Sequence, residues 1–385
     1  MEGKSNYNPE SGRNPVTGVG NLDNRLGWIG WQILLPGSGR RVWDIIHHFG
    51  SPVEAWQASE NDLQGVPCVG VQGARKLVQR RKNIQFDNLE KYLEKISCKV
   101  LTIDDETYPY LLKCIHDPPP AIFVRGHLPQ DDCIGIAIIG SRKPSPYGLV
   151  VTETLAGELA RGGIEIISGM ARGIDSASHR AALMNNGMTM AVLGCGPDIV
   201  YPRENEKLMK QIIEKGAIIT EFPPGTMPEP WHFPSRNRII SGLSSAVVVI
   251  EAAEKSGALI TADFALEQGR EVMAVPGNIN NPKSAGTNKL IKQGASLVTG
   301  ALDILKELGI ETKDIKSQQK KSKKVTLEVN EKKVLAVLSE IPQTMEQVIN
   351  LSKLLPEEVA AALTILEIEG LIRSLPGKMY INAGL

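Results

Sequence analysis

An apolar strand leads directly into a loop of small residues at Ile134-Gly135-Ile136-Ala137-Ile138-Ile139-Gly140-Ser141-Arg142. The same arrangement returns twice: residues 164–167 precede the loop 168–175, and residues 188–193 precede Gly194-Cys195-Gly196. Helical patterns separate these strands. Alternating strands and helices of this kind predict a doubly wound, Rossmann-like α/β domain with a parallel sheet and right-handed crossovers.

Further apolar segments extend this sheet. Residues 217–220, 246–250 and 271–275 continue the alternation, and 246–250 is wholly apolar, as a central parallel strand covered on both faces should be. Residues 86–130 add a helix and two strands, near 100–103 and at 121–124, with proline-rich turns between them. We therefore expect an extended Rossmann-like core over residues 86–308.

Two smaller domains and two polar segments flank the predicted core. Residues 1–20 are rich in Asn, Gly, Pro and Ser and have no helical period, so we expect them to be disordered. Residues 309–324 shift to Lys, Ser and Gln and indicate a solvated basic linker. The remaining segments predict an N-terminal helical domain at 21–85 and a C-terminal winged-helix domain at 325–385.

The helical domain contains a helix, a turn with Gly70 and Gly73, and a second helix. That second helix carries Arg75, Lys76, Arg80, Arg81 and Lys82. The order is typical of a SAM-like or helix-hairpin-helix module, in which turn amides touch a nucleic-acid backbone without reading its sequence. A small packing module with solvated basic side chains explains the same residues equally well.

Residues 325–385 read as three helices, at 332–338, 345–351 and 357–369, followed by a β-ribbon around Pro376-Gly377. This is the order of a winged helix. The expected recognition helix has four glutamates and no Lys or Arg, and the domain has 5 basic against 8 acidic residues, a net charge of −3. DNA phosphates would repel such a helix. We therefore favour a protein-contact or accessory role for this domain.

The overall composition limits the classes of function. The 385 residues include 43 basic and 43 acidic side chains, so any nucleic-acid site must be a local patch. Five scattered cysteines favour a reducing compartment, and there is neither a signal-peptide core nor a stretch of about 20 apolar residues. We expect a cytoplasmic protein that does not enter membranes and that has no metal site or cofactor.

Basic residues recur in the segments that follow the strands. Small residues at strand ends let the next helix begin close to a ligand, so that free amides and the helix dipole face an anion. A single arginine is more commonly part of a surface ion pair, but loops that converge at one sheet edge predict an anion crevice. The residues expected there are Gly140, Ser141, Arg142, Lys143, Gly169, Arg172, Gly173, Arg203, Phe233, Arg236, Asn237 and Arg238.

Several neighbouring residues have two interpretations. His179 lies one helical turn after Asp175, so the two could form an acid–base pair or brace a loop around a buried imidazole. Glu251 could be a general base, bind a ribose hydroxyl, or accept hydrogen bonds from the following loop. Phe233 is either a stacking platform for a base or a core residue. Secondary, structural or site-bracing roles are expected for Asp175, His179, Glu251, Ser256, Gly257 and Thr261.

The motifs of the common nucleotide-dependent and nucleophilic enzymes are missing from the sequence. There is no P-loop, and Gly194-x-Gly196 lacks the third glycine of a dinucleotide fingerprint, since Ile199 stands in its place. There is also no G-x-S-x-G motif and no His and Cys cluster with metal spacing. Convergent arginines without such motifs favour a binding protein that is not an enzyme.

Taken together, the motifs of residues 105–305 resemble the DNA-processing protein A family, also called Smf, of bacterial recombination mediators. The resemblance rests on their order and spacing. The motifs include Gly140-Ser141-Arg142, Ser168-Gly169-x-Ala171-x-Gly173-Ile174-Asp175 with His179, Tyr201-Pro202-x-x-Asn205, Phe233-Pro234-x-Arg236-Asn237-Arg238, and Ser256-Gly257-x-Leu259-Ile260-Thr261. One departure is Ala258, where a serine is commoner in the family.

This resemblance implies a Rossmann-like core that binds single-stranded DNA in a positive pocket and forms a homodimer. It further implies that the protein protects incoming DNA during natural transformation and loads the RecA recombinase onto the strand. By position, Arg142 and Arg203 would be the principal phosphate contacts. Arg236 and Arg238 would flank the same pocket, with Phe233 near the bases.

A nucleotide-processing enzyme is the alternative. Residues 251–277 also resemble phosphoribohydrolases, in which Arg and Glu cleave the N-glycosidic bond of a nucleoside monophosphate. The Pro-Gly-Gly-x-Gly-Thr signature of that group is absent, because Pro276-Gly277 is followed by Asn278-Ile279. A third interpretation is a bound nucleotide that only regulates DNA binding.

Overall fold

The computed structural model describes residues 23–129, 133–310, 327–339, 342–368, 371–375, 377 and 379–382. The chain forms two compact units, one within residues 1–144 and 151–311 and the other within 145–150 and 312–385. The segment predicted to be disordered, 1–20, lies outside the described residues, as does nearly all of the predicted basic linker, 309–324. In the described part of the chain, no helix is both long and apolar enough to cross a bilayer.

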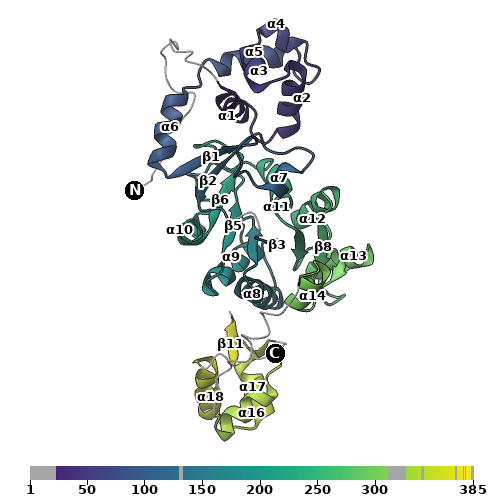
Figure 1. Cartoon of the computed structure of the whole chain (residues 1–385). Helices are drawn as coiled ribbons and strands as arrows, with labels where there is room; N and C mark the ends of the chain where they lie inside the picture. Colours follow the sequence, from purple (N-terminus) through teal and green to yellow (C-terminus); the bar gives the residue numbers. More distant parts are fainter. Residues whose placement is uncertain are drawn as a thin grey trace. The chain divides into compact units, whose positions relative to one another are not determined.

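The first unit is built on a nine-stranded sheet with the order β1-β2-β6-β5-β4-β3-β7-β8-β9 (Figure 1). The strands are β1 (Cys98–Thr102), β2 (Ala121–Gly126), β3 (Gly135–Ile139), β4 (Glu165–Ser168), β5 (Thr189–Val192), β6 (Ala217–Thr220), β7 (Ala246–Val249), β8 (Glu271–Ala274) and β9 (Ser296–Leu297). All neighbours from β6 to β9 are parallel, and β1 and β2 join as antiparallel strands. The predicted Rossmann-like α/β fold with an N-terminal extension of the sheet is confirmed.

The strand order reverses direction between β3 and β7. From β3 the chain adds β4, β5 and β6 on one side, then returns and adds β7, β8 and β9 on the other. β3 and β7 pair in parallel along their length, from Ile136↔Ala246 to Ile139↔Val249. Connections that leave two adjacent strands in opposite directions open a crevice at the carboxyl ends of those strands. The fold therefore places a crevice directly after Ile139 and Val249.

Helices connect the strands and cover the sheet. They are α7 (Tyr110–Lys113), α8 (Pro146–Arg161), α9 (Ile174–Met184), α10 (Glu206–Lys215), α11 (His232–Gly242), α12 (Gly257–Glu267), α13 (Ala285–Lys292) and α14 (Ala301–Glu307), with short 3-10 turns η1 (Arg203–Asn205) and η2 (Pro282–Ser284). β7 is buried along its whole length. The strand is uniformly apolar because both of its faces are covered and neither meets water, as expected from the sequence.

The N-terminal helices are α1 (Asn24–Leu34), α2 (Gly39–Phe49), α3 (Pro52–Gln57), α4 (Glu60–Gln64), α5 (Gly70–Arg81) and α6 (Phe86–Lys95). Of these helices, α1 and α6 pack on the sheet, and the others pack on α1 or on one another. Gln32 Nε2 donates to the Glu221 carbonyl at 2.7 Å, and Trp43 Nε1 donates to the Pro118 carbonyl at 2.8 Å. Buried residues such as Trp31 and Ile122 belong to one continuous apolar core. These helices are thus part of the same compact unit as the sheet.

Two of the basic side chains on α5 serve local packing. The Arg80 guanidinium donates to the Leu34 carbonyl at 3.0 Å, and Arg81 donates to the carbonyls of Trp56 and Ala58. Arg75, by contrast, is exposed. The contacts of Arg80 and Arg81 support the packing-module interpretation for these two residues. A nucleic-acid role for this domain stays a prediction.

The second unit has the element order of a winged helix. It contains α16 (Val329–Val337), β10 (Gln343–Thr344), α17 (Met345–Ser352), α18 (Pro356–Ile368), β11 (Ile372–Leu375) and β12 (Met379–Asn382), with a small sheet ordered β10-β12-β11. Thr344 and Gln347 form a reciprocal capping box at the start of α17. Val334, Val348 and Leu363 bring the three helices together in one apolar core. The predicted C-terminal winged helix is confirmed.

Candidate functional site

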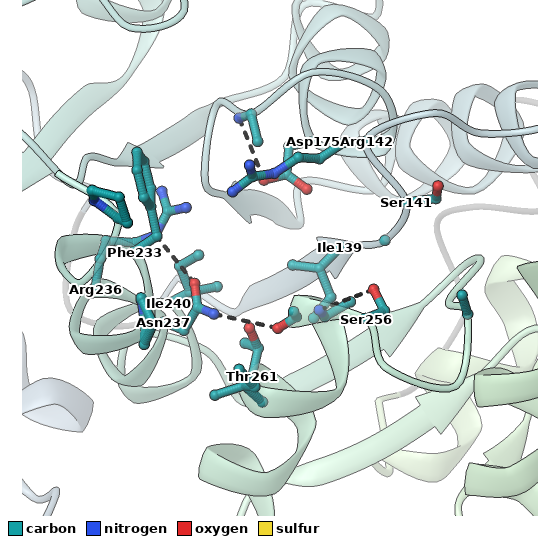
Figure 2. Close-up of a pocket in the computed structure, with 18 of the residues that line it drawn as sticks. Ile139, Ser141, Arg142, Asp175, Phe233, Arg236, Asn237, Ile240, Ser256 and Thr261 are labelled. Atoms are coloured by element: carbon teal, nitrogen blue, oxygen red, sulfur yellow. Dashed lines mark hydrogen bonds between the residues drawn. The ribbon is translucent and has the colours of Figure 1, made fainter. Parts of the chain in front are cut away.

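A cavity of about 610 Å³ opens at the crevice between β3 and β7 (Figure 2). Its size lies in the usual range for a small-ligand pocket. Three segments supply most of its polar lining: the loop after β3, the first turns of α11, and the first turns of α12. The lining residues include Gly140, Ser141, Arg142, Asp175, Tyr201, Phe233, Arg236, Asn237, Ser256, Gly257 and Thr261.

The loop after β3 is held by the loop after β4. The Ile174 amide donates to the Ser141 carbonyl at 3.2 Å, and the Lys143 amide donates to the Ser141 hydroxyl at 3.1 Å. Gly173 has a φ of 78° at this crossing, and a side-chain carbon there would overlap the Ser141 carbonyl. Glycine at 173 is therefore needed both for the backbone angle and for the close approach. The crossing fixes the position of Arg142.

Arg142 and two aromatic rings form one wall of the cavity. The guanidinium carbon of Arg142 lies 5.4 Å from the centroid of the half-buried Phe233 ring, within the range of a cation–π contact. The ring of Tyr201 lies 5.4 Å from that of Phe233 and is inclined to it by 37°. Tyr201 is 40% exposed. A cation and two aromatic rings, one half-buried and one exposed, therefore meet in the lining of the cavity.

The place of Tyr201 beside Phe233 was missed by the sequence reasoning, which treated Tyr201 only as part of a motif. The two residues are far apart in the sequence. Only the path of the loop that leads from β5 to η1 brings the Tyr201 ring to α11. One feature of the sequence could have suggested a place for Tyr201 near the cavity: it lies in the connection that follows β5.

Arg236 lies behind this wall and is buried. Its guanidinium donates to the Gly169 carbonyl at 2.7 Å and to the Val192 carbonyl, so it ties together the ends of β4 and β5. A side-chain carbon at Gly169 would lie 2.5 Å from this guanidinium. Burial lowers the pKa of Arg236 to about 10, while the nearby Asp175 carboxylate opposes that shift. Arg236 thus stays charged at neutral pH and adds positive potential to the cavity.

The structure does not bring Arg238 to the cavity, which corrects the expectation that Arg238 flanks it beside Arg236. The segment that carries both residues is the helix α11, not a loop as expected. Residues two apart on a helix point about 200° apart. Arg238 therefore turns to the opposite side, where its Nη2 lies 2.6 Å from a Glu221 carboxylate oxygen and its Nε lies 3.2 Å from an Asp117 oxygen. It is a buried structural ion pair.

The other three predicted basic residues do not line the main cavity. Arg172 lines a smaller neighbouring cavity of about 60 Å³, but its guanidinium is paired with Glu204, with an Nη2–Oε2 distance of 2.9 Å. Arg203 and Lys143 are exposed and lie outside the lining of both cavities. Of the predicted basic residues, the cavity linings thus contain Arg142, Arg172 and Arg236.

His179 is bonded to Thr189, not to Asp175. Its Nδ1 lies 2.7 Å from the Thr189 hydroxyl, which itself donates to the Ile166 carbonyl at 2.6 Å. The hydroxyl must therefore accept from a protonated Nδ1, and Nε2 has no hydrogen-bond partner within the described residues. Burial, with help from nearby arginines, lowers the pKa of His179 to about 3. The imidazole is neutral and braces the sheet.

The two carboxylates near the site have different surroundings. Asp175 lines the cavity from the first turn of α9, and its pKa is raised by burial while Arg236 opposes the shift. Glu251 is 1% exposed and is not part of the cavity lining. Its predicted role as a general base therefore gains no support from its position. No cluster of three or more His, Cys, Asp or Glu suited to a metal ion occurs among the described residues.

The wall opposite Arg142 is the N-terminus of α12. The Ser256 hydroxyl accepts from the Ala258 amide at 3.3 Å and caps this helix. Asn237 reaches across from α11, and its Nδ2 donates to the Gly257 carbonyl at 3.4 Å. Thr261 lies one turn further along and lines the cavity. These residues join α11 to α12, and they also present polar atoms to the ligand space (Figure 2).

Comparisons with known proteins agree with this architecture. The family model for DNA recombination-mediator protein A matches residues 99–309, and the model for the DprA winged helix domain matches residues 318–378. Protein Smf of Synechocystis sp. is 34% identical over 388 residues, which cover 92% of this chain and 97% of that protein. DNA processing protein DprA of Bacillus subtilis is 46% identical over 209 residues, which cover 54% of this chain and 70% of that protein.

Two solved structures are similar as well. DNA processing protein A from Streptococcus pneumoniae superposes with a TM-score of 0.66 at 34% identity, covering 74% of this chain and 98% of the other. DNA processing protein A from Helicobacter pylori, described by its single-stranded DNA binding mode, superposes with a TM-score of 0.50 at 32% identity, covering 55% and 95%. The chain therefore belongs to the DNA recombination-mediator protein A family.

Proposed function

We propose that this protein binds single-stranded DNA at the cavity between β3 and β7 and acts as a recombination mediator, not as an enzyme. The proposal depends above all on one observation: the Arg142 guanidinium lies 5.4 Å from the centroid of the half-buried Phe233 ring, in the cavity at the crevice where the strand order reverses. A guanidinium suits a phosphate, and an aromatic ring that lines the cavity suits an unpaired base. The Helicobacter pylori relative, described as binding single-stranded DNA, supports the same ligand.

This arrangement explains why a single strand would be preferred to a duplex. In a duplex, both faces of each base are covered by neighbouring bases, so no face is free to stack on Phe233. An unpaired, flexible strand can place one base on the ring while its phosphate meets Arg142. Contacts of this kind read no base sequence. Binding should therefore tolerate any sequence and leave the base edges of the strand accessible.

Family membership extends the proposal to the biological role. The protein would hold and protect incoming single-stranded DNA during natural transformation and load the RecA recombinase onto it. Phosphate contacts suit this task because they leave the bases free for pairing in the next step. We further propose that the protein works in the cytoplasm as a homodimer.

The enzymatic alternative, a phosphoribohydrolase-like reaction, requires a carboxylate at the bound nucleotide. Glu251, the carboxylate that the sequence suggested for this role, does not line the cavity. Asp175 does line it, but this carboxylate lies beside the charged groups of Arg142 and Arg236. The direct test is incubation of the protein with nucleoside monophosphates, followed by detection of free base. Release that disappears in Glu251→Gln would replace the mediator proposal with the enzymatic one.

The main experiment compares the affinity for a short oligothymidylate with that for a duplex of the same length, over a range of salt concentrations. The single strand should bind more tightly. Arg142→Ala should weaken binding and reduce the slope of log K against log salt by about 0.7, as expected for one lost phosphate contact on a single strand.

Lys143→Ala is the matched control, because Lys143 is the next residue, is exposed, and lies outside the cavity lining. It should have a much smaller effect. Equal affinity for both DNA forms, or equal effects of the two substitutions, would contradict binding in the cavity.

A further inference from the structure

We infer that the cavity contains a second phosphate-binding subsite at the N-terminus of α12, formed by the Gly257 amide and the hydroxyls of Ser256 and Thr261. The inference rests on the proposed function and extends it. Arg142 would hold one phosphate of the strand, and α12 would hold the next one. Ser256, Gly257 and Thr261 would then contact the ligand directly, beyond the bracing role expected from the sequence.

The first support is the direction of α12. Ser256, Gly257, Ala258 and Thr261 all line the cavity, so the N-terminus of this 11-residue helix faces the ligand space. Gly257 is its first residue, and its amide can have no partner inside the helix. The helix dipole adds partial positive charge at the same place. A side-chain carbon at Gly257 would have no atom within 4 Å, so there is open space beside this first residue of the helix.

The second and independent support is the Thr261 hydroxyl. Thr261 is only 2% exposed, yet it lines the cavity, and its hydroxyl forms no hydrogen bond within the described part of the chain. A helical threonine can bond to the carbonyl four residues earlier, which here is the Gly257 carbonyl. Asn237 Nδ2 already donates to that oxygen at 3.4 Å. A hydroxyl that lines a cavity and has no hydrogen-bond partner in the protein can donate its proton to a ligand there.

The charges around this wall also suit an anion. Asp175, the acidic residue in the cavity lining, lies on α9 near Arg142 (Figure 2). Glu254 and Lys255, which precede Ser256, line an adjoining cavity of about 390 Å³ with Asp263, and none of these three charged residues lines the main cavity. The α12 wall therefore offers an uncharged amide and hydroxyl donors to an acceptor-rich ligand. A phosphate oxygen matches that donor set.

The two subsites define how a strand would lie. A phosphate at Arg142 and a phosphate at Gly257 would stand on opposite walls, with a base on Phe233 between or beside them. The subsites differ in physical character, because Arg142 supplies full charge while α12 supplies hydrogen bonds and a dipole. Only the loss of Arg142 should therefore change the number of counterions released on binding.

The test uses the full chain and the variant Thr261→Val, which keeps the shape of the side chain and deletes the hydroxyl. We expect about tenfold weaker binding to a single strand, as for one lost hydrogen bond to a charged group, with an unchanged salt slope. Thr287→Val is the matched control. Thr287 is a buried helical residue on α13 whose hydroxyl donates to the Ser284 carbonyl at 3.1 Å, and it does not line the cavity.

Neutral methylphosphonate linkages placed one at a time along the strand identify which phosphates are bound. The unaltered protein should lose affinity when either of two linkages is made neutral. For Thr261→Val, neutralising one of these two linkages should no longer change the affinity. For Arg142→Ala, neutralising the other linkage should no longer change the affinity. A single sensitive linkage, or a Thr261→Val protein that binds as tightly as the unaltered one, would overturn the second subsite while leaving single-strand binding itself intact.

A free nucleotide carries the same phosphate chemistry, so a competition experiment distinguishes the two sources. Thymidine 5′-monophosphate should compete weakly, and a dinucleotide with two phosphates should compete better in a Thr261-dependent manner. Thr261-dependent competition by the monophosphate, combined with Thr261-independent binding of the strand, would instead assign the subsite to free nucleotides and overturn our assignment. Failure of the unaltered protein to prefer single strands would contradict the proposed function itself.

Discussion

Arg236 and Arg238 lie two residues apart on α11, yet their guanidinium groups join different parts of the molecule. Arg236 bonds to the carbonyls of Gly169 and Val192 behind the cavity, whereas Arg238 pairs with Glu221, an acid that is completely buried. On one side of α11, Arg236 joins the helix to the ends of β4 and β5, and on the other side Arg238 joins it to the segments that contain Glu221 and Asp117. The two arginines should respond differently to substitution.

Arg238→Ala should destabilise the fold without directly altering the cavity. Removal of one partner leaves the buried Glu221 carboxyl without its cation, which typically costs about 3–5 kcal/mol in the free energy of unfolding. Urea unfolding measures that loss. Binding of a single strand, measured where the variant is still folded, should stay near that of the unaltered protein.

Arg172→Ala is the control for this prediction, because it breaks the exposed ion pair with Glu204 and should change the free energy of unfolding much less. A stable Arg238→Ala protein with weak DNA binding would contradict the structural role and restore Arg238 as a cavity residue.

The contrast also shows what the sequence could predict. Eight of the nine strands of the large sheet were predicted closely because they are short apolar runs bounded by turn residues, whereas the two-residue β9 was not predicted. The position of Arg142 followed directly from the end of β3. The side on which Arg238 lies was not predicted, because the Phe233-Pro234 start of α11 was interpreted as a loop. Two residues that share one face of an extended chain point to opposite sides of a helix.

The sequence also could not predict which residues of distant segments pair with each other. Arg172 and Glu204 are 32 residues apart, and each belongs to a separate connection of the sheet. No local pattern marks such a pair, so a convergent arginine cannot be distinguished from a paired one in the sequence. The same holds for the contact between Tyr201 and Phe233.

Gly173→Ala should damage both stability and binding. At position 173 the φ of 78° disfavours a side chain, and the added methyl group would also push against the Ser141 carbonyl that positions Arg142. Gly269→Ala separates the two effects, because Gly269 has a φ of 66° but open space around its side-chain position. Gly269→Ala should lose roughly 1–2 kcal/mol through backbone strain. Gly173→Ala should lose more, because its ψ of −126° lies outside the left-handed helical region and its methyl group would overlap a carbonyl, and only this variant should also lose DNA affinity. Thermal unfolding and strand-binding titrations make the comparison.

The two aromatic rings in the lining of the cavity should each contribute to stacking. Phe233→Leu should weaken binding of a single strand by about 1–3 kcal/mol, and Phe233→Tyr should retain most of the affinity. Tyr201→Leu should have a smaller effect. A strand that carries 2-aminopurine reports stacking directly, since its fluorescence is quenched on an aromatic face. Quenching that persists in a Phe233→Leu, Tyr201→Leu double variant would show that the base lies elsewhere.

The pH dependence of stability should reflect two buried groups with opposite effects. Burial lowers the pKa of His179 from 6.5 to about 3, so below pH 6.5 the unfolded chain gains a proton that the folded protein cannot accept. Stability therefore falls as the pH drops from 6.5 towards 3. Burial raises the pKa of Glu165 from 4.5 to about 8, so its folded carboxyl keeps a proton that the unfolded chain releases. Stability therefore also falls as the pH rises from 4.5 towards 8.

Between pH 4.5 and 6.5 the two contributions oppose each other, and outside that window one acts alone. Each contributes up to about 1.4 kcal/mol per pH unit. Urea unfolding of Glu165→Gln across this range is the measurement. The substitution should lessen the decline on the alkaline side, to which the raised pKa values of the buried Asp175 and Glu221 also contribute, and leave the acidic decline in place. An unchanged alkaline limb would show that Glu165 is ionised in the folded protein.

Removal of residues 311–385 should leave single-strand binding largely intact. The cavity is lined entirely by residues between Ile139 and Thr261, whereas the winged-helix unit places Glu357 and Glu358 in the first turn of α18. An acidic first turn does not favour contact with phosphates, so the unit should add little to affinity. The truncated and full-length chains should show the same salt slope in parallel titrations with oligothymidylate. If truncation removed most of the affinity or flattened the slope, the cavity could not be the principal site, and phosphate contacts would have to be sought in the linker or the winged helix.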